Sequence, residues 1–152
     1  MKKRVVILVT LLLTFGLCLV STASADQISG AGTIWAKGVG EAMIQGDGEV
    51  EIVVHGVATV WANNTETLDA SGRGHRWEAP GGATVLWGWS GTIYASGEHM
   101  TVWMRGGLIE FTASGTGWVY LRGHGKYETS GHKGFWRPTG EILSMENVQQ
   151  AE

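Results

Sequence analysis

The sequence predicts an all-β protein. Over residues 28–62 every second residue is aliphatic or glycine, whereas most of the interleaved residues are polar or aromatic. Such strict alternation indicates β-strand with one buried face. Gly-x-Gly pairs recur every eight residues in this stretch, and the same pattern returns over residues 107–131. Because strands usually hold about 3–10 residues and glycine marks turns, we expect roughly ten short strands, each ending at glycines.

The connection at each glycine pair determines the architecture. The alternation keeps its phase across the glycines, whereas a two-residue hairpin loop would reverse it. A three-residue loop with a glycine bulge preserves the phase and would give an antiparallel meander, closed as a sandwich or a barrel. A bent strand-arch also preserves it and would give a β-solenoid or a stack of β-arches. The sequence leaves both open, and in either case the expected turn glycines are Gly30, Gly32, Gly38, Gly40, Gly46, Gly48, Gly115, Gly117, Gly123 and Gly125.

Residues 1–25 are predicted to be a signal peptide. A basic start at residues 2–4 precedes an apolar run over residues 5–20, and small residues at 23–25 form a cleavage site. Cleavage there would remove Cys18, the single cysteine, and would lower the formal net charge from −3 to −6. We therefore expect a secreted, acidic chain without disulfides. Nucleic acid is not an expected partner, and neither is a membrane once the leader is cleaved.

The rest of the chain is expected to form one repetitive β domain, residues 26–139, followed by a C-terminal tail, residues 140–152. Residues 63–82 are polar and rich in turn residues, so they are predicted to be a loop. Asn63 begins an Asn-x-Thr sequence and is therefore a candidate glycosylation site. The tail loses the alternation, which favours a loose end or a brief helix.

The alternation also predicts which residues form the core. The aliphatic set should be buried, so that a charge placed in it would be costly. Its largest members are Ile34, Ile44, Val50, Ile52, Val54, Ile109, Phe111, Val119 and Leu121.

Aromatic residues recur on the opposite face of the expected strands. The tetrapeptide threonine, aliphatic, aromatic and then a small or apolar residue occurs at residues 33–36, 59–62, 92–95 and 101–104. Three interpretations are open for these aromatic side chains: a second core between sheets, a contact between chains, or a platform on which sugars stack. The residues of this aromatic face are Trp35, Trp61, Tyr94, Trp103, Trp118 and Tyr120.

The sequence contains no motif that predicts catalysis, a metal or a cofactor. The five histidines lack the spacing of zinc sites. Asp47 lies between two glycines, but calcium rolls need an aspartate on every turn, so Asp47 is interpreted as an ordinary turn residue. Two glutamate pairs, Glu49 with Glu51 and Glu110 with Glu128, lie on exposed strand faces, which requires no catalytic role. We expect that the protein is not an enzyme.

The leader, the cysteine-free exported chain and the glycine octads resemble the major sheath proteins of methane-producing archaea. Those cells live as filaments inside tubular proteinaceous sheaths. The resemblance covers residues 28–62 and 83–131. It implies a structural role outside the cell, with no catalytic residue.

The scarcity of residues that protect strand edges gives an independent argument for assembly. Beyond the leader, lysine occurs only at positions 37, 126 and 133, and Pro80 and Pro138 lie outside the expected strands. Weakly protected strands favour continuation of the sheet from one chain to the next. We therefore expect a homopolymer, resembling functional amyloid, that assembles through sheet edges and aromatic contacts into an extracellular sheath or surface layer. The alternative is a secreted carbohydrate-binding or adhesive β module, and cell-surface polysaccharide is a further candidate partner.

Overall fold

A computed structural model describes residues 31–146, which form five strands and no helix. The all-β prediction is confirmed. The predicted signal peptide, Gly30 and the last six residues of the tail lie outside the described residues. The strands are β1 (Gly32–Asn63), β2 (Thr67–Glu78), β3 (Thr84–Thr129), β4 (Lys133–Phe135) and β5 (Glu141–Ser144).

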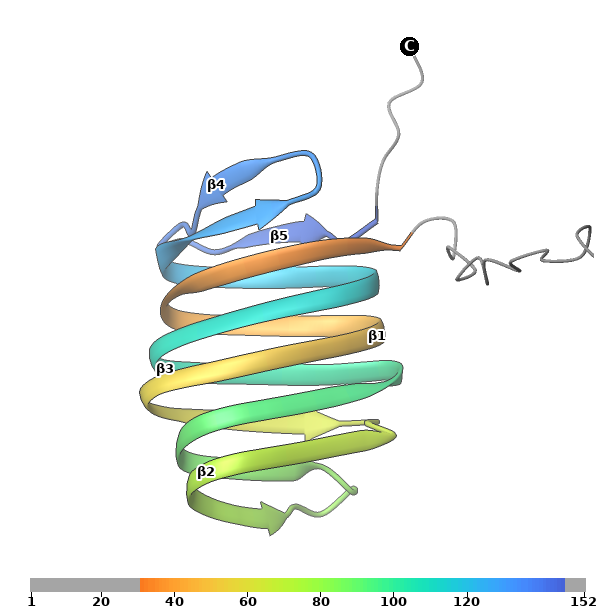
Figure 1. Ribbon diagram of the computed structural model, residues 1–152, viewed down its shortest axis with the longest axis vertical. Helices are drawn as coiled ribbons and strands as arrows, with labels where there is room; N and C mark the ends of the chain where they lie inside the picture. The colour runs from red at the N-terminus through yellow and green to blue at the C-terminus, as the bar shows by residue number, and fades with distance from the viewer. Residues whose placement is uncertain (1–30, 147–152) are drawn as a thin grey trace, which may run out of the picture.

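The two longest strands, β1 and β3, run antiparallel and wind together as one flattened coil (Figure 1). Most residues of β1 pair with β3 on both sides. Ile34, for example, pairs with Ala113 and with Thr129, which are 16 residues apart in β3. One turn of the coil therefore takes about two octads, and each octad crosses one of the two layers. The spacing of eight in the sequence is half a turn.

The predicted meander of roughly ten short strands is wrong. β1 and β3 continue through their glycines, which bend the chain without reversing it. In a meander, consecutive octads would pair with each other, whereas here the octads of β1 pair with those of β3. The sheet is open, with the order β1-β3-β2 and with β4 and β5 also on β3, so the predicted closed barrel is wrong too. The alternative prediction, in which the strands bend at the glycines, is nearer to the structure. It differs in that two antiparallel strands, β1 and β3, wind together in the coil.

At the corners of the coil, glycine faces glycine on the neighbouring turn. Gly46 has a φ of 152°, and a Cβ atom there would overlap the carbonyl oxygen of Thr116. Glycine is required because the bend needs both this backbone angle and this close approach. The nine predicted turn glycines that the structure describes all take part in such pairs, which are Gly32–Gly115, Gly38–Gly125, Gly40–Gly123, Gly46–Gly117 and Gly48–Gly115.

The core lies between the two layers and consists of the predicted aliphatic face. All nine predicted core residues are buried, with exposed fractions of 0–3%. Trp136 closes the core at the end of the coil near β4. Its ring lies against Gly38 and Gly125, and its indole nitrogen donates a hydrogen bond of 3.2 Å to the carbonyl oxygen of Lys126. The glycine pair therefore also makes room for a capping indole.

Two segments outside the repeat pair where no strand is predicted. Residues 67–78 form β2, which pairs antiparallel with β3, so most of the predicted loop at 63–82 is an edge strand. Its side chains are largely exposed, which explains its polar sequence. Residues 141–144 form β5 on the other side of β3, so the predicted loose end or brief helix is wrong there.

The edges of the sheet are protected, contrary to the sequence-based expectation. Arg76 and Glu78 of β2 pair with the buried residues Leu86 and Thr84 and therefore lie on the inward side of the sheet. Glu141 of β5 pairs with buried Leu121 in the same way. Inward-pointing charges on edge strands oppose the addition of another strand. Pro80 and Pro138 follow β2 and β4 and limit these edges further.

Candidate functional site

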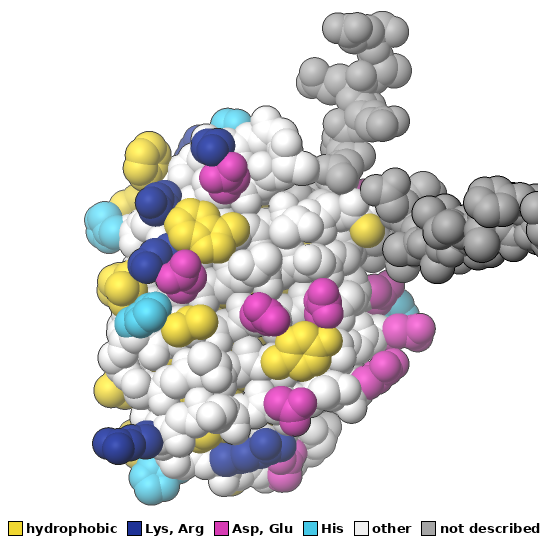
Figure 2. Space-filling view, viewed as in Figure 1, with side chains coloured by type: hydrophobic (Ala, Val, Ile, Leu, Met, Phe, Trp, Pro, Cys, Tyr) yellow, Lys and Arg dark blue, Asp and Glu magenta, His cyan; other side chains and the backbone are white. Residues whose placement is uncertain are grey.

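The outward side chains form two faces, because each glycine corner carries the chain from one layer to the other. We call the face turned towards the viewer in Figures 1 and 2 the front face and the opposite one the back face. The predicted aromatic residues are divided between them. Trp35 and Tyr94 lie on the front face, and Trp61, Trp103, Trp118 and Tyr120 lie on the back face.

The back face carries apolar side chains in a row that crosses the strands. Trp61 pairs with Trp103, and Met43 pairs with both Trp103 and Tyr120. We call these four residues the aromatic row. All four are half-buried. Trp118 lies beside the row, where it pairs with Gln45. The row continues at its two ends through Val85, Trp77 and Ile142.

Glutamates hold the polar tips of three aromatic side chains. Trp103 donates to Glu41 at 2.6 Å, and Tyr94 donates to Glu49 at 3.0 Å. Trp35 donates in the same way to Glu110 on the neighbouring strand segment at 3.1 Å. These rings lie on the outside of the coil. The interpretation that the aromatic side chains form a second core between sheets is therefore wrong. The contact between chains and the sugar platform both stay open.

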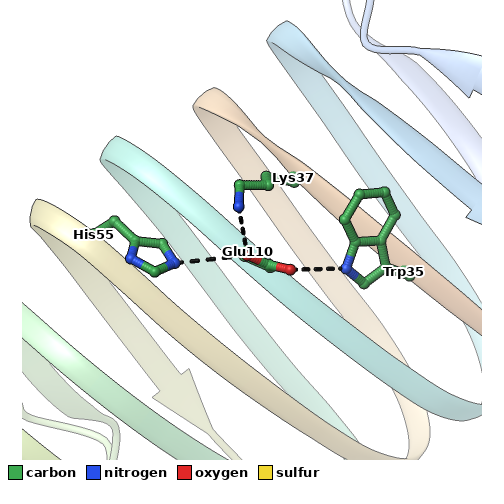
Figure 3. A network of polar contacts seen from close by, with 4 residues as sticks. All are labelled: Trp35, Lys37, His55 and Glu110. Atoms are coloured by element: carbon green, nitrogen blue, oxygen red, sulfur yellow. Dashed lines mark hydrogen bonds and ion pairs between the residues drawn. The ribbon is translucent and has the colours of Figure 1, made fainter.

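On the front face, Glu110 is the centre of a network that joins three adjacent strand segments (Figure 3). It accepts hydrogen bonds from the Lys37 ammonium at 2.8 Å and from the Trp35 indole at 3.1 Å. The His55 imidazole lies 3.5 Å from the same carboxylate. The hydrogen bonds from Lys37 and Trp35 hold the pKa of Glu110 below its ordinary value of 4.5. The Lys126 ammonium lies 5.4 Å from the centre of the Trp35 ring and fixes it from the other side.

Charge is distributed unevenly over the front face. Figure 2 shows basic side chains towards its upper left and at its lower end, and acidic ones across its centre and right. Glu110 is paired with Lys37, and Glu128 is paired with Lys133 at 2.8 Å. Glu51 and Asp69, in contrast, have no ion-pair partner within residues 31–146.

Glu51 and Asp69 flank Tyr94 on its two neighbouring strands. The three residues line a groove of about 430 Å³, which Ile52 and Ile93 also line. In this groove the Tyr94 ring therefore lies between two carboxylates that have no ion-pair partner in the described residues. We call Glu51 and Asp69 the carboxylate pair.

The back face carries the complementary arrangement beside the aromatic row. Arg105 and Arg122 flank Glu41 on its two neighbouring strands. Both are exposed, and neither forms an ion pair within the described part of the chain. Together with Glu41 they line a shallow groove of about 320 Å³. We call Arg105 and Arg122 the arginine pair.

The remaining predicted residues have structural surroundings. Asp47 lies at a corner, where its carboxylate accepts the backbone N–H of His99 at 2.7 Å and contacts the His99 imidazole at 3.0 Å. His99 has a φ of 53°, so Asp47 supports a strained turn, as expected of a turn residue. Asn63 lies at the end of β1 on the back face. Across residues 31–146 no three histidine, cysteine or acidic side chains gather in a way that could hold a metal ion.

Sequence reasoning missed Met43, Trp77, Ile142 and the arginine pair. Met43 interrupts the polar alternation, which is a signal that its neighbourhood is apolar. Trp77 lies in the segment predicted to be a loop. The arginine pair has no sequence signal, because Arg105 and Arg122 become neighbours only through Glu41 on another strand.

Comparisons with family models, curated proteins and solved structures give no match to this chain. In the described region, no helix is present that could cross a membrane. The site therefore has to be interpreted from its own geometry.

Proposed function

We propose that this protein is an exported structural building block that self-assembles into an extracellular sheath or surface layer. The observation that carries the proposal is the aromatic row on the back face. Trp61, Trp103, Met43 and Tyr120 follow one another across four neighbouring strand segments. A contiguous apolar surface of this kind on a soluble domain commonly marks an interaction site.

The size of the expected contribution follows from the area that a contact would cover. If Trp61 and Trp103 each lost about 50 Å² of exposed surface, the gain would be about 2.5 kcal/mol at ~25 cal/mol per Å². Association costs reduce this figure, so several such contacts would be needed for a stable polymer. An assembly of many copies repeats the same contact and so supplies the number of contacts needed. Trp103, which Glu41 holds in place, also loses little side-chain freedom when it is covered.

The aromatic contacts, rather than the sheet edges, support this proposal. Inward-facing Arg76, Glu78 and Glu141 protect both ends of the coil. The proposal also agrees with the resemblance to archaeal sheath proteins, which rests on the glycine octads. A structural role needs no catalytic group, and the carboxylate with a lowered pKa, Glu110, lies in an ion-paired network on an open face.

The test is sedimentation of the purified protein and of the variant Trp61→Ser with Trp103→Ser. Both residues lie in the aromatic row, so we expect the variant to fold like the parent but to need at least about tenfold higher concentration to assemble. Phe135→Ser is the matched control, because Phe135 is 77% exposed on β4 and lies outside the row. Circular dichroism checks the fold of each protein. A parent that stays monomeric at high concentration would refute the proposal.

The same aromatic row is also the basis of the alternative, a carbohydrate-binding or adhesive module, because aromatic faces stack on sugar rings. This alternative predicts a soluble parent that cosediments with cell-wall polysaccharide. It further predicts that the double tryptophan variant loses this binding while remaining monomeric. Sedimentation with and without polysaccharide therefore separates the two functions.

A further inference from the structure

We propose that the back face of one copy packs on the front face of the next, with the arginine pair of the first copy bound to the carboxylate pair of the second. This inference rests on the proposed self-assembly and specifies its contact. The partner is a second copy of this chain.

The spacing of the charges supports this contact. Arg105 and Arg122 both neighbour Glu41, one on either side, so they lie two strand spacings apart. Glu51 and Asp69 both neighbour Tyr94, one on either side, and are separated by the same interval. With neighbouring strands about 4.8 Å apart, each pair spans about 9–10 Å. Both pairs lie across the strands, along the axis of the coil. Two arginines can therefore reach two carboxylates at once when the coil axes of two copies are aligned.

The environment of the charges supports it as well. None of the four side chains has an ion-pair partner within residues 31–146, whereas Glu110 and Glu128 elsewhere on the front face are neutralised by lysines. The carboxylate pair lies beside the Tyr94 ring, whose face attracts guanidinium groups. On the other surface, the arginine pair lies next to the aromatic row, since Arg105 follows Trp103 and Arg122 follows Tyr120 by two residues in β3. A contact that joins the charges therefore also covers apolar surface.

The contact joins two different surfaces, so it leaves one free surface of each kind on every added copy. Such head-to-tail contacts continue into open assemblies unless the rotation closes a ring. The arginine pair lies towards the β5 end of the coil, because Arg122 neighbours the β4–β5 connection. The carboxylate pair lies towards the other end, because Asp69 belongs to the edge strand β2. Successive copies are therefore staggered along the coil axis, as in a brick layer.

Charge reversal tests the contact. The first variant carries Arg105→Glu and Arg122→Glu, and the second carries Glu51→Lys and Asp69→Lys. Each variant alone places like charges opposite each other, and we expect its assembly to need at least about tenfold more protein than the parent. An equimolar mixture should assemble again, because the reversed pairs complement each other and the intact pairs still match. In the parent, raising the salt concentration to about 1 M should weaken assembly, because the Debye length falls to about 3 Å.

The control variant, Arg73→Glu with Lys133→Glu, makes the same change in net charge as the arginine variant but outside both pairs. It should assemble like the parent. If the parent assembles and both reversed variants assemble equally well, the front-to-back contact is refuted while the proposed function stands. If both variants fail alone and their mixture also fails, direct pairing between these residues is refuted. If the parent itself never assembles, the proposed function fails and this inference fails with it.

Discussion

Replacing a corner glycine by alanine should test the coil directly. Gly46 combines a φ of 152° with a carbonyl oxygen of the neighbouring turn in the place of a Cβ atom. The backbone strain is of the order of 1–3 kcal/mol, and overpacking against a backbone that cannot rotate away costs about 1–3 kcal/mol more. Gly46→Ala should therefore destabilise the protein by about 2–6 kcal/mol. Because small domains have only about 5–15 kcal/mol of stability, the effect should be large.

Two further glycines separate the causes. Gly56 has a φ of 115° but nothing within 4 Å of its Cβ position, so Gly56→Ala carries the strain without the clash. Gly131 also has open space, and its φ lies outside the region that disfavours side chains, so Gly131→Ala should be nearly neutral. Thermal unfolding followed by circular dichroism should rank the melting temperatures in the order Gly131→Ala, Gly56→Ala, Gly46→Ala. At about 4 °C per kcal/mol, Gly46→Ala should melt roughly 8–24 °C below the parent. Equal melting of Gly46→Ala and Gly131→Ala would refute the paired-glycine corner.

Two other predictions concern the core and the front-face network. Ile52→Asp places an unpaired charge at a position that is 1% exposed and should cost several kcal/mol in denaturant unfolding, whereas Val53→Asp, one residue further along on the outer face, should cost much less. In Glu110→Gln the ionised carboxylate is lost. The folded-state pKa of Glu110 lies below its ordinary value of 4.5. The ionised carboxylate therefore contributes to the free energy of unfolding above pH 4.5, and this contribution disappears as the pH falls through the folded-state pKa. The stability gap between parent and variant should therefore be measurable at pH 7 and close in strong acid. A gap of the same size at pH 2 would contradict this assignment, and Glu98→Gln serves as the control.

The sequence predicted the inward and outward faces correctly because alternation depends only on local backbone geometry. Ile34 and Leu121, for example, belong to different strands, and each is fully buried as expected. The spacing of eight was also informative, since it corresponds to half a turn of the coil. What the glycines do at each corner was harder to predict. A bend and a three-residue reversal preserve the same phase, so alternation cannot distinguish them.

The pairing partners could not be predicted because they depend on contacts far apart in the chain. Gly46 faces Gly117, and Trp61 faces Trp103, through the winding of β3 around β1. The edge strand β2 was missed for a physical reason as well. A strand that covers the end of a coil has few buried positions, so its sequence resembles that of a loop.

The position of the charged residues on the edges determines the direction in which copies can be added. Continuation of the coil along its axis would require β2 of one copy to pair with β4 or β5 of another. That pairing would place Arg76, Glu78 and Glu141 beside a second buried layer, where each charge needs a partner to offset its desolvation. Contacts between faces offset this cost, because the arginine pair and the carboxylate pair supply each other's partners when they meet. The same residues that keep the ends of the coil from adding strands therefore favour growth sideways, face upon face.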